Sequence, residues 1–571
     1  MERKSGSIAS GAAMLVAAAF LFLSCASIAP TASRTGFALG EWGGGGLVRT
    51  RYGVLEGRAD RDGTLAWLGI PYAAPPLGDL RWQAPRPPSP WLGTRQATRF
   101  ASRSIQRSSL LGTTVGSEDS LYLNVWRPAT DARNLPVYVW IHGGGNTSGA
   151  SDASPEYYGH ALAARAGLVF VSVNYRLGIF GWFSHPSLRT GDPNTDSGNF
   201  GTLDLIASLE WVRDNIAAFG GDPLNVTIAG ESAGAFNALT LLIAPAARGL
   251  FHKAVVQSGY TRTSKTDPGE YAGQLAGRLA LRQGKAGNEE EAKAYLESLG
   301  GDETAKWLRD ASPGELLRLA KPSSRGILPL PYPIFDGTVL PSDGFKALAD
   351  PERRAEVPLL IGTNKEETKL FMFFWRRNSR DPDFRKLAEV TSAVWKAEGA
   401  DSVADALSTK AGTGKVYLYR FDWGAPDGKG KSVLGSWAGA SLGASHGMEI
   451  PFFLQTDVVY GNRMPFRIFT AANMRGRLDL QSRIGVYLSN FVRMGNPNPP
   501  ADGARGDTPH WDPWDASLAE PSFIVLDAGF DKARIVVEYG RAVREEILLD
   551  MESEASKALL KKYLEIAPLL E

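Results

Sequence analysis

Residues 230–234 read Gly-Glu-Ser-Ala-Gly, and this pentapeptide with its surroundings constrains the fold more than any other stretch of the chain. An apolar run at residues 226–229 precedes it and a helix-like run at residues 235–239 follows, which indicates a strand, a sharp turn and a helix. A Gly-x-Ser-x-Gly sequence in that context is typical of a nucleophile elbow, with the serine at the apex of a strained turn. Glycines flank the serine because a side chain at either position would clash with the neighbouring strand or helix. We therefore predict that Ser232 is a nucleophile; the alternative is a tight structural turn.

A glycine-rich loop upstream favours the nucleophile over the structural turn. Residues 135–141 form an apolar run typical of a buried strand, and His142 and three glycines follow it directly. Consecutive glycines expose backbone N–H groups that can stabilise the charge on a carbonyl oxygen during acyl transfer. We predict an oxyanion hole formed by the N–H groups of Gly144, Gly145 and Ala233.

A serine nucleophile needs a base, and the chain has six histidines. Hydrolases built around such an elbow have the order serine, acid, histidine along the chain, so the base lies well downstream. Only His446 and His510 meet that condition. His446 lies in a loop of small residues, whereas His510 lies in what reads as a surface turn. We predict that His446 is the base and that activity rises through an apparent pKa of roughly 6–7.

The acid that orients this histidine should follow a strand, because α/β sheets place functional groups at the carboxyl ends of their strands. Residues 357–361 read as a buried strand, and Glu367 lies just beyond it. The adjacent Glu366 points elsewhere on any regular backbone. Asp336 is the rival acid, although its surroundings are more typical of a turn. We predict Glu367 as the acid.

Apolar strands and helical runs alternate along the chain, which favours an α/β fold. Further strands are predicted at residues 168–173, 253–257 and 416–421, and a helix at residues 203–212. Two segments, at about residues 271–320 and 381–407, are rich in helical patterns and are predicted to form a cap over the site. Residues 538–570 read as a C-terminal helix.

Together these motifs resemble the type-B carboxylesterase/cholinesterase family of α/β-hydrolases, from about Leu47 to the C-terminus. The resemblance is carried by residues 69–72, 80–82, 117–126, 174–176, 198–201, 219–223, 257–259 and 495–499 in addition to the motifs above. It implies the α/β-hydrolase fold, a central mostly parallel sheet with helices on both faces and helical cap insertions. It places the family's triad on Ser232, Glu367 and His446.

The resemblance also implies structural features around the site. Arg81 and Glu118 should form a buried ion pair, and Ser258 should belong to a hydrogen-bond network behind the triad. The family usually has a cysteine at the position of Ser120, where a disulfide closes a flap beside the site. This chain cannot form that disulfide, since its single cysteine is Cys25.

The N-terminus reads as an export signal. Arg3 and Lys4 precede an apolar stretch that is too short to span a bilayer comfortably and ends at Ser24-Cys25. This resembles a bacterial lipobox, in which Cys25 is lipidated and becomes the first mature residue. Ordinary cleavage near Ala32 or Ser33 is the alternative. We predict a signal peptide at residues 1–25, a linker at 26–45 and a catalytic domain at 46–571, in a protein that is exported, either periplasmic, anchored to a membrane as a lipoprotein, or secreted.

The overall charge narrows the possible partners. A net charge of +1 argues against a nucleic-acid partner. No H-E-x-x-H or C-x-x-C spacing occurs, so neither a metal nor a cofactor is predicted. The partner expected is a small-molecule ester, and the sequence says nothing about oligomeric state.

The segment between Trp82 and Glu118 contains five arginines and no Asp, Glu or Lys. Because the guanidinium fork matches a carboxylate, we predict that Arg99 and Arg103 bind an ester that carries a free carboxylate. The alternative is a solvated loop. The predicted function is a serine carboxylic-ester hydrolase that works through an acyl-enzyme. Other possibilities are a non-catalytic adhesion relative, which would typically lack the nucleophile, and a lipase, for which no clear lid is present.

Overall fold

The computed structural model describes residues 40–561 except 109–111, 262–266, 321–332, 375–382, 409–413, 501–507, 552–557 and 560. The predicted signal peptide with Cys25 and most of the predicted linker lie outside the described residues. None of the helices in the described ranges has the length and hydropathy needed to cross a bilayer.

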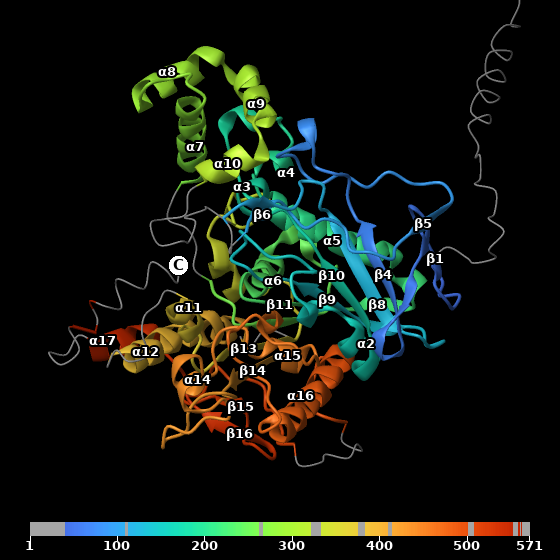
Figure 1. The fold of residues 1–571 in the computed structure, drawn as a ribbon, viewed down its shortest axis with the longest axis vertical. Helices are drawn as coiled ribbons and strands as arrows, with labels where there is room; N and C mark the ends of the chain where they lie inside the picture. The colour runs from blue at the N-terminus through green and yellow to red at the C-terminus, as the bar shows by residue number, and fades with distance from the viewer. Residues whose placement is uncertain are drawn as a thin grey trace, which may run out of the picture. The chain divides into compact units, whose positions relative to one another are not determined.

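A single large sheet of eleven strands organises the chain (Figure 1). Its strands, in chain order, are β3 (Arg58–Asp60), β4 (Thr64–Pro71), β8 (Tyr122–Pro128), β9 (Leu135–Ile141), β10 (Val169–Val173), β11 (Gly221–Glu231), β12 (Lys253–Gln257), β13 (Leu359–Asn364), β14 (Val416–Phe421), β15 (Ser522–Ala528) and β16 (Ala533–Tyr539). Their spatial order is β16-β15-β14-β13-β12-β11-β9-β10-β8-β4-β3. The strands from β15 to β10 pair in parallel, and the strands at both ends pair antiparallel.

The described helices are α2 (His160–Ala166), α3 (Gly178–Gly181), α4 (Pro193–Asp196), α5 (Phe200–Asn215), α6 (Ala233–Ile243), α7 (Pro268–Arg282), α8 (Glu289–Leu299), α9 (Gly301–Asp310), α10 (Pro313–Leu319), α11 (Lys369–Phe374), α12 (Phe384–Lys396), α13 (Ser402–Leu407), α14 (Ser436–Ser441), α15 (Ile450–Phe453), α16 (Met474–Met494) and α17 (Arg544–Met551). Of these, α5 and α6 pack on one face of the sheet, and α2, α15 and α16 pack on the other. Two smaller sheets join β1 (Leu47–Thr50), β2 (Gly53–Glu56) and β5 (Thr94–Gln96), and β6 (Gln106–Arg107) with β7 (Thr114–Val115).

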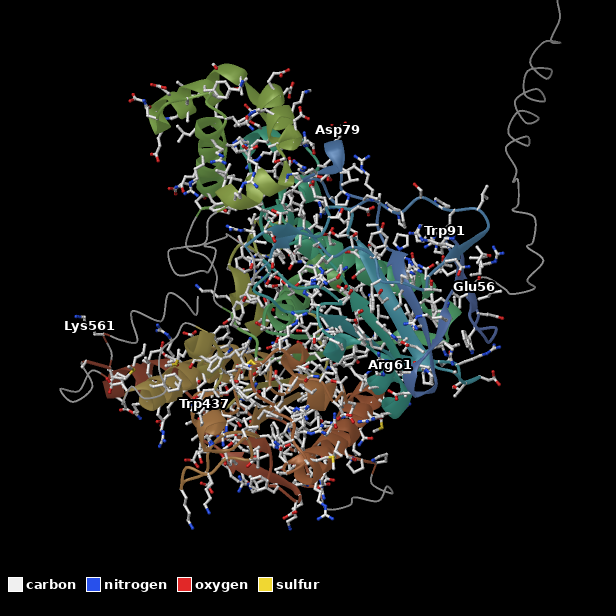
Figure 2. All side chains as sticks on the ribbon, viewed as in Figure 1. Glu56, Arg61, Asp79, Trp91, Trp437 and Lys561 are labelled. Carbon is white, nitrogen blue, oxygen red and sulfur yellow. The ribbon has the colours of Figure 1, made fainter. Side chains whose placement is uncertain are left out.

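Alternate residues of the central strands enter two different cores. On β9, Val137 and Val139 pack in a cluster with α5 and α6, whereas Tyr138 and Trp140 pack with α2, α15 and α16. Side chains fill the space between the ribbons of sheet and helices (Figure 2). A strand buried on both faces is apolar at every position, which explains why β9 reads as an uninterrupted hydrophobic run.

Helices α7 to α10 form the first predicted cap segment and contain no strand among their described residues. Their apolar faces join a separate cluster that includes Trp82 and Phe180 from the body of the domain. The second predicted cap segment comprises α12, a π-helical turn η8 (Ala397–Asp401) and α13. Residues of η8 and α13 belong to the same core as the central strands, so this segment packs against the sheet.

The predicted helix at residues 538–570 is wrong at its beginning. Glu538 and Tyr539 end strand β16, where Tyr539 pairs with Ser522 of β15, and the helix α17 begins only at Arg544. Alternating partly buried residues on β16 fit an edge strand, and pairing with β15 overrides their local helical pattern.

Candidate active site

The Gly-Glu-Ser-Ala-Gly segment forms a sharp turn between β11 and α6. Ser232 at its apex has φ 58° and ψ −124°, a strained conformation for a residue with a side chain. A Cβ on Gly230 would lie 2.3 Å from the carbonyl carbon of Gly234, and one on Gly234 would lie 2.0 Å from the carbonyl oxygen of Ile141. Both glycines are therefore required by the close approach of helix and strand, as the sequence predicts.

The predicted oxyanion loop packs directly against the nucleophile. A Cβ on Gly143 would lie 3.1 Å from Ser232 Cβ. Gly144 and Gly145 follow with φ 112° and 61°, in the region that favours glycine. Because these glycines follow Gly143 and Ala233 follows Ser232, the three predicted N–H groups belong to two backbone segments that are in contact.

The end of this loop is tied to the helix that carries the nucleophile. Asn146 Oδ1 accepts a 2.8 Å hydrogen bond from Asn237 Nδ2 on α6 and a 3.2 Å hydrogen bond from the Tyr175 hydroxyl. The same hydroxyl lies 2.7 Å from the His142 carbonyl oxygen, to which it donates. These bonds hold the loop rigidly beside the start of α6.

The predicted acid and base are in contact. Glu367 Oε2 lies 2.7 Å from His446 Nδ1, and both side chains are buried. The other oxygen of Glu367 accepts a 2.7 Å hydrogen bond from the backbone N–H of Asn364 at the end of β13. A carboxylate held this way orients the imidazole and stabilises its charged form.

A carboxylate that the sequence reasoning did not assign faces the other side of the imidazole. Glu231 Oε1 lies 3.1 Å from His446 Nε2. Neither of these two atoms forms a hydrogen bond within the described residues, so Nε2 is not bonded to Ser232 Oγ. The hydrogen bond between a catalytic base and its nucleophile is often long in the absence of substrate and shortens when the substrate binds.

The surrounding charges shift the titration of this histidine. Burial by itself lowers the pKa of His446, but the carboxylates of Glu231 and Glu367 outweigh it and raise the pKa to about 9. Burial raises the pKa of Glu231 well above the usual carboxyl range. The protonation of each group depends on the charge of the other, and the imidazole of His446 becomes neutral only in mild alkali.

Two more buried carboxyl groups lie behind the histidine. Glu449 accepts hydrogen bonds from Asn364 Nδ2 and, at 3.3 Å, from the Ser258 hydroxyl, which forms the network that the family resemblance implies. Burial, and next the charge of Glu367, raise the pKa of Glu449. Burial raises the pKa of Glu156 to about 7.

Glu231, Glu449 and Glu156 are all absent from the sequence-based assignment. Proximity in the sequence could have indicated two of them, because Glu231 directly precedes Ser232 and Glu449 lies three residues beyond His446. Nothing local distinguishes Glu156, which reaches the cluster only through tertiary packing.

The rejected alternatives have structural roles. Asp336 accepts backbone N–H groups of Thr338, Val339 and Leu340 at 3.1 Å each, which stabilises a turn. His510 is exposed beside Asp512.

Aromatic rings surround the imidazole on its outer side. The rings of Phe371 on α11 and Trp395 on α12 lie 5.1 and 5.0 Å from the His446 ring. Tyr260 lies 6.2 Å from Trp395 and stacks at 4.7 Å on Phe236, one turn into α6. The predicted base therefore borders an apolar, aromatic wall that continues to Phe236 on α6.

The two arginines predicted to bind substrate have different surroundings. Arg103 forms an ion pair with Asp152 at 3.3 Å. Burial lowers the pKa of His142, and the charge of Arg103 lowers it further. Arg99 lines an open depression of about 580 Å³ whose lining includes none of the predicted catalytic residues. Its neighbour Thr98 forms a β-bridge with Leu68 of β4. Strand β4 is the fourth strand from β11 in the sheet, which corresponds to about 19 Å between β4 and β11 at the usual strand spacing.

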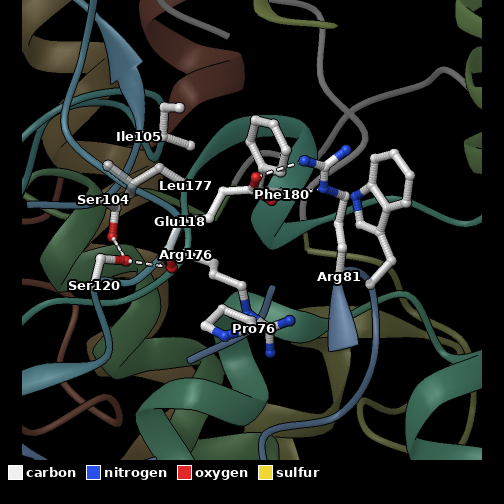
Figure 3. A pocket seen from close by; sticks show the side chains of 10 residues that line it. Pro76, Arg81, Ser104, Ile105, Glu118, Ser120, Arg176, Leu177 and Phe180 are labelled. Carbon is white, nitrogen blue, oxygen red and sulfur yellow. Dashed lines mark hydrogen bonds and ion pairs between the residues drawn. The ribbon is translucent and has the colours of Figure 1, made fainter. Parts of the chain in front are cut away.

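Figure 3 shows the side chains around a small pocket in the segment that the resemblance predicts to be a flap. Ser104 Oγ and Ser120 Oγ form a 2.9 Å hydrogen bond. Arg81 forms the ion pair that the resemblance implies, with Glu118 at 2.6 and 2.7 Å, and both side chains are buried. Serine hydroxyls thus join two segments of the flap non-covalently.

No group of three or more His, Cys, Asp or Glu side chains in the described part of the chain is arranged to hold a metal ion.

Comparison with known proteins identifies the family. Residues 45–397 match the model of the carboxylesterase family. The chain is 33% identical over 490 residues to the para-nitrobenzyl esterase of Bacillus subtilis, covering 79% of this chain and 90% of that protein. It is 43% identical over 338 residues to the fumonisin B1 esterase of Sphingopyxis macrogoltabida, covering 57% of each.

Solved structures agree. A PNB esterase structure superposes with a TM-score of 0.65 at 29% identity, covering 86% of this chain and 97% of that one. The Geobacillus stearothermophilus carboxylesterase superposes with a TM-score of 0.63 at 30% identity, covering 86% and 97%. The non-catalytic alternative is not favoured, because the relatives are esterases. The chain belongs to the carboxylesterase family, has the α/β-hydrolase fold and is a carboxylic-ester hydrolase.

Proposed function

We propose that this enzyme cleaves carboxylic esters through an acyl-enzyme formed on Ser232. Ser232 Oγ attacks the ester carbonyl while His446 Nε2 takes its proton, and the same nitrogen returns the proton to the departing alcohol. Glu367 holds the imidazole through Nδ1, and the N–H groups of Gly144, Gly145 and Ala233 stabilise the oxyanion. Water then attacks the acyl-enzyme by the same route. The observation that supports this most is the 2.7 Å contact between Glu367 and His446, a histidine that also contacts Glu231, the residue before the strained serine.

The test is covalent labelling combined with substitution. An organophosphate is expected to label Ser232, and Ser232→Ala should lower kcat on a nitrophenyl ester by roughly 10⁴-fold or more while the protein stays folded. His446→Ala should cost a similar factor, and the double variant little more, because the two residues act as a unit. If Ser232→Ala retains most of the activity, this assignment is wrong.

We propose further that the preferred ester carries a free carboxylate that Arg103 attracts, with Arg99 as a more distant contributor. The support is that the segment carrying Arg103 contacts the chain just beyond the oxyanion loop, where Gln106 accepts a 2.9 Å hydrogen bond from the Gly149 N–H. The test compares kcat/KM for a neutral ester and its carboxylate-bearing analogue at low and high salt, in wild type, Arg103→Ala and Arg99→Ala. A preference for the anion that fades with salt and falls in Arg103→Ala is expected. Equal turnover of both esters at low salt contradicts it.

A wider panel of ester substrates should include a para-nitrobenzyl ester and fumonisin B1, which the names of two relatives suggest.

We propose that the protein is exported and anchored to a membrane through lipid on Cys25. The support is the apolar stretch before the single cysteine of the chain. In a bacterium with lipoprotein machinery, labelled fatty acid should be incorporated and the protein should fractionate with membranes, and Cys25→Ser should abolish both. Absence of label from the wild type would favour ordinary cleavage near Ala32.

A further inference from the structure

The loop that carries the base is attached to the strand end that carries the acid. Glu366 N–H donates to the Ala444 carbonyl at 3.0 Å, and His446 N–H donates to the Glu367 carbonyl at 3.2 Å. Asn364 Nδ2 adds a 2.8 Å hydrogen bond to the Ser445 carbonyl. The distance between the acid and the base therefore depends on how residues 444–446 are docked against residues 364–367.

The Glu366 side chain completes this docking. Its Oε2 accepts a 3.2 Å hydrogen bond from the Ala444 N–H. The same oxygen occupies the space beside Gly443, because a Cβ at Gly443 would lie only 1.8 Å from it. Gly443 has φ 55°, so the loop turns sharply around the carboxylate. One carboxylate thus meets the backbone of the histidine loop at two successive residues.

Lys369 holds that carboxylate in place. Its Nζ lies 2.6 Å from Glu366 Oε1, and it donates a 3.3 Å hydrogen bond to the Gly439 carbonyl on α14. The Lys369 side chain is 2% exposed and that of Glu366 is 15% exposed. A buried ammonium needs such a partner, since an isolated buried charge is strongly disfavoured. The pair therefore connects α11, α14 and the histidine loop.

We propose that Glu366 and Lys369 are positioning residues that set the place of His446 for proton transfer. This inference rests on the proposed roles of His446 and Glu367. The pair touches neither the serine nor the imidazole, so it acts only through residues 443–446. A misplacement of about 1 Å in a catalytic group can cost about 10²-fold in rate, so a loosened loop lowers kcat without removing any catalytic group.

The experiment compares Glu366→Ala with Glu366→Gln. Alanine removes the acceptor of the Ala444 N–H and should lower kcat on a neutral nitrophenyl ester by about 10- to 100-fold, with KM changed by less than about threefold. Glutamine keeps an acceptor for the Ala444 N–H but removes the charge that Lys369 pairs with, so its kcat should lie between that of Glu366→Ala and that of the wild type. The second readout is the downfield proton resonance of the His446–Glu367 hydrogen bond, which should shift or broaden most in Glu366→Ala.

Two further variants keep the test decisive. Asp343→Ala removes an exposed ion pair with Arg353 and should change neither readout. If Glu366→Ala does not fold, Glu366→Asp replaces it, since the shorter side chain cannot reach both Ala444 N–H and Lys369 Nζ, and it should lower kcat several-fold.

The inference is overturned if a folded Glu366→Ala, or Glu366→Asp in its place, has the kcat and the downfield resonance of the wild type. Failure of the proposed function would be distinct, because wild-type Ser232 would then not be labelled by the organophosphate. In that case the resonance still reports whether the pair positions His446.

Discussion

Replacing Glu231 by glutamine should move the pH dependence of the enzyme to lower pH. The substitution keeps the shape of the side chain and removes a charge 3.1 Å from His446 Nε2. The base works only as neutral imidazole, and its pKa is raised to about 9. The imidazole is therefore protonated at neutral pH, and wild-type activity should rise with pH through that value, instead of through the range of roughly 6–7 expected from the sequence.

The size of the shift follows from the geometry. Two unit charges 3.1 Å apart interact by about 5 kcal/mol at an effective dielectric constant of about 20, which is an upper limit. The carboxylate is only partly ionised there, because burial raises its own pKa. Opposite charges at such distances typically shift a pKa by about 1–3 units, or about 1.4–4 kcal/mol. We expect the ascending limb of Glu231→Gln to lie about 1–2 units below that of the wild type.

The assay is kcat/KM for phenyl acetate between about pH 5 and 10, which reports the pKa of the free enzyme. Glu156→Gln is the matched control, since it neutralises a buried carboxyl of the same cluster that has no contact with His446, and its limb should move by less than about half a unit. A limb of Glu231→Gln that coincides with wild type, in a folded enzyme whose chemical step limits the rate, would refute the reasoning.

Two other predictions concern the flap and the cap. Arg81→Met leaves Glu118 buried without its partner and removes 2.7 Å hydrogen bonds to the carbonyls of Arg309 and Ala311. The free energy of unfolding in urea should fall by about 3–5 kcal/mol, and the α7–α10 segment should become susceptible to proteases. An unchanged midpoint would contradict the role of this pair, and Arg353→Met, which breaks an exposed pair, is the control. Ser104→Cys/Ser120→Cys, made together with Cys25→Ser, should form a disulfide because the two hydroxyls lie 2.9 Å apart, with a stabilisation of about 2–4 kcal/mol that a reductant reverses. Two free thiols after oxidation would show that the flap geometry is different.

The fold was largely predictable from local sequence, because strands buried on both faces produce uninterrupted apolar runs. The predicted strands at residues 135–141, 253–257 and 416–421 coincide with β9, β12 and β14. The edge strand β16 was missed, because an edge strand is apolar on one face only and its assignment depends on the partner β15.

The elbow around Ser232 was readable for a related reason. Glycines at positions 230 and 234 are demanded by contacts within a few residues and with the adjacent strand, so the constraint leaves a trace in the sequence itself. Of the distant pieces, Glu367 and His446 were found from their position after a predicted strand and in a small-residue loop. The structure brings these two side chains to 2.7 Å.

The sequence by itself therefore determined the α/β architecture and the glycine-flanked turn at Ser232, and it predicted Glu367 and His446 as the acid and base, because each leaves a local pattern of glycine or apolar residues. Only the tertiary structure decided the environment of the base. Glu231, Glu449 and Glu156 come together from three distant segments, and the Glu366–Lys369 pair meets a loop that lies more than seventy residues further along the chain. Burial and charge at these positions depend on distances across the fold, and no local pattern of residues encodes such distances.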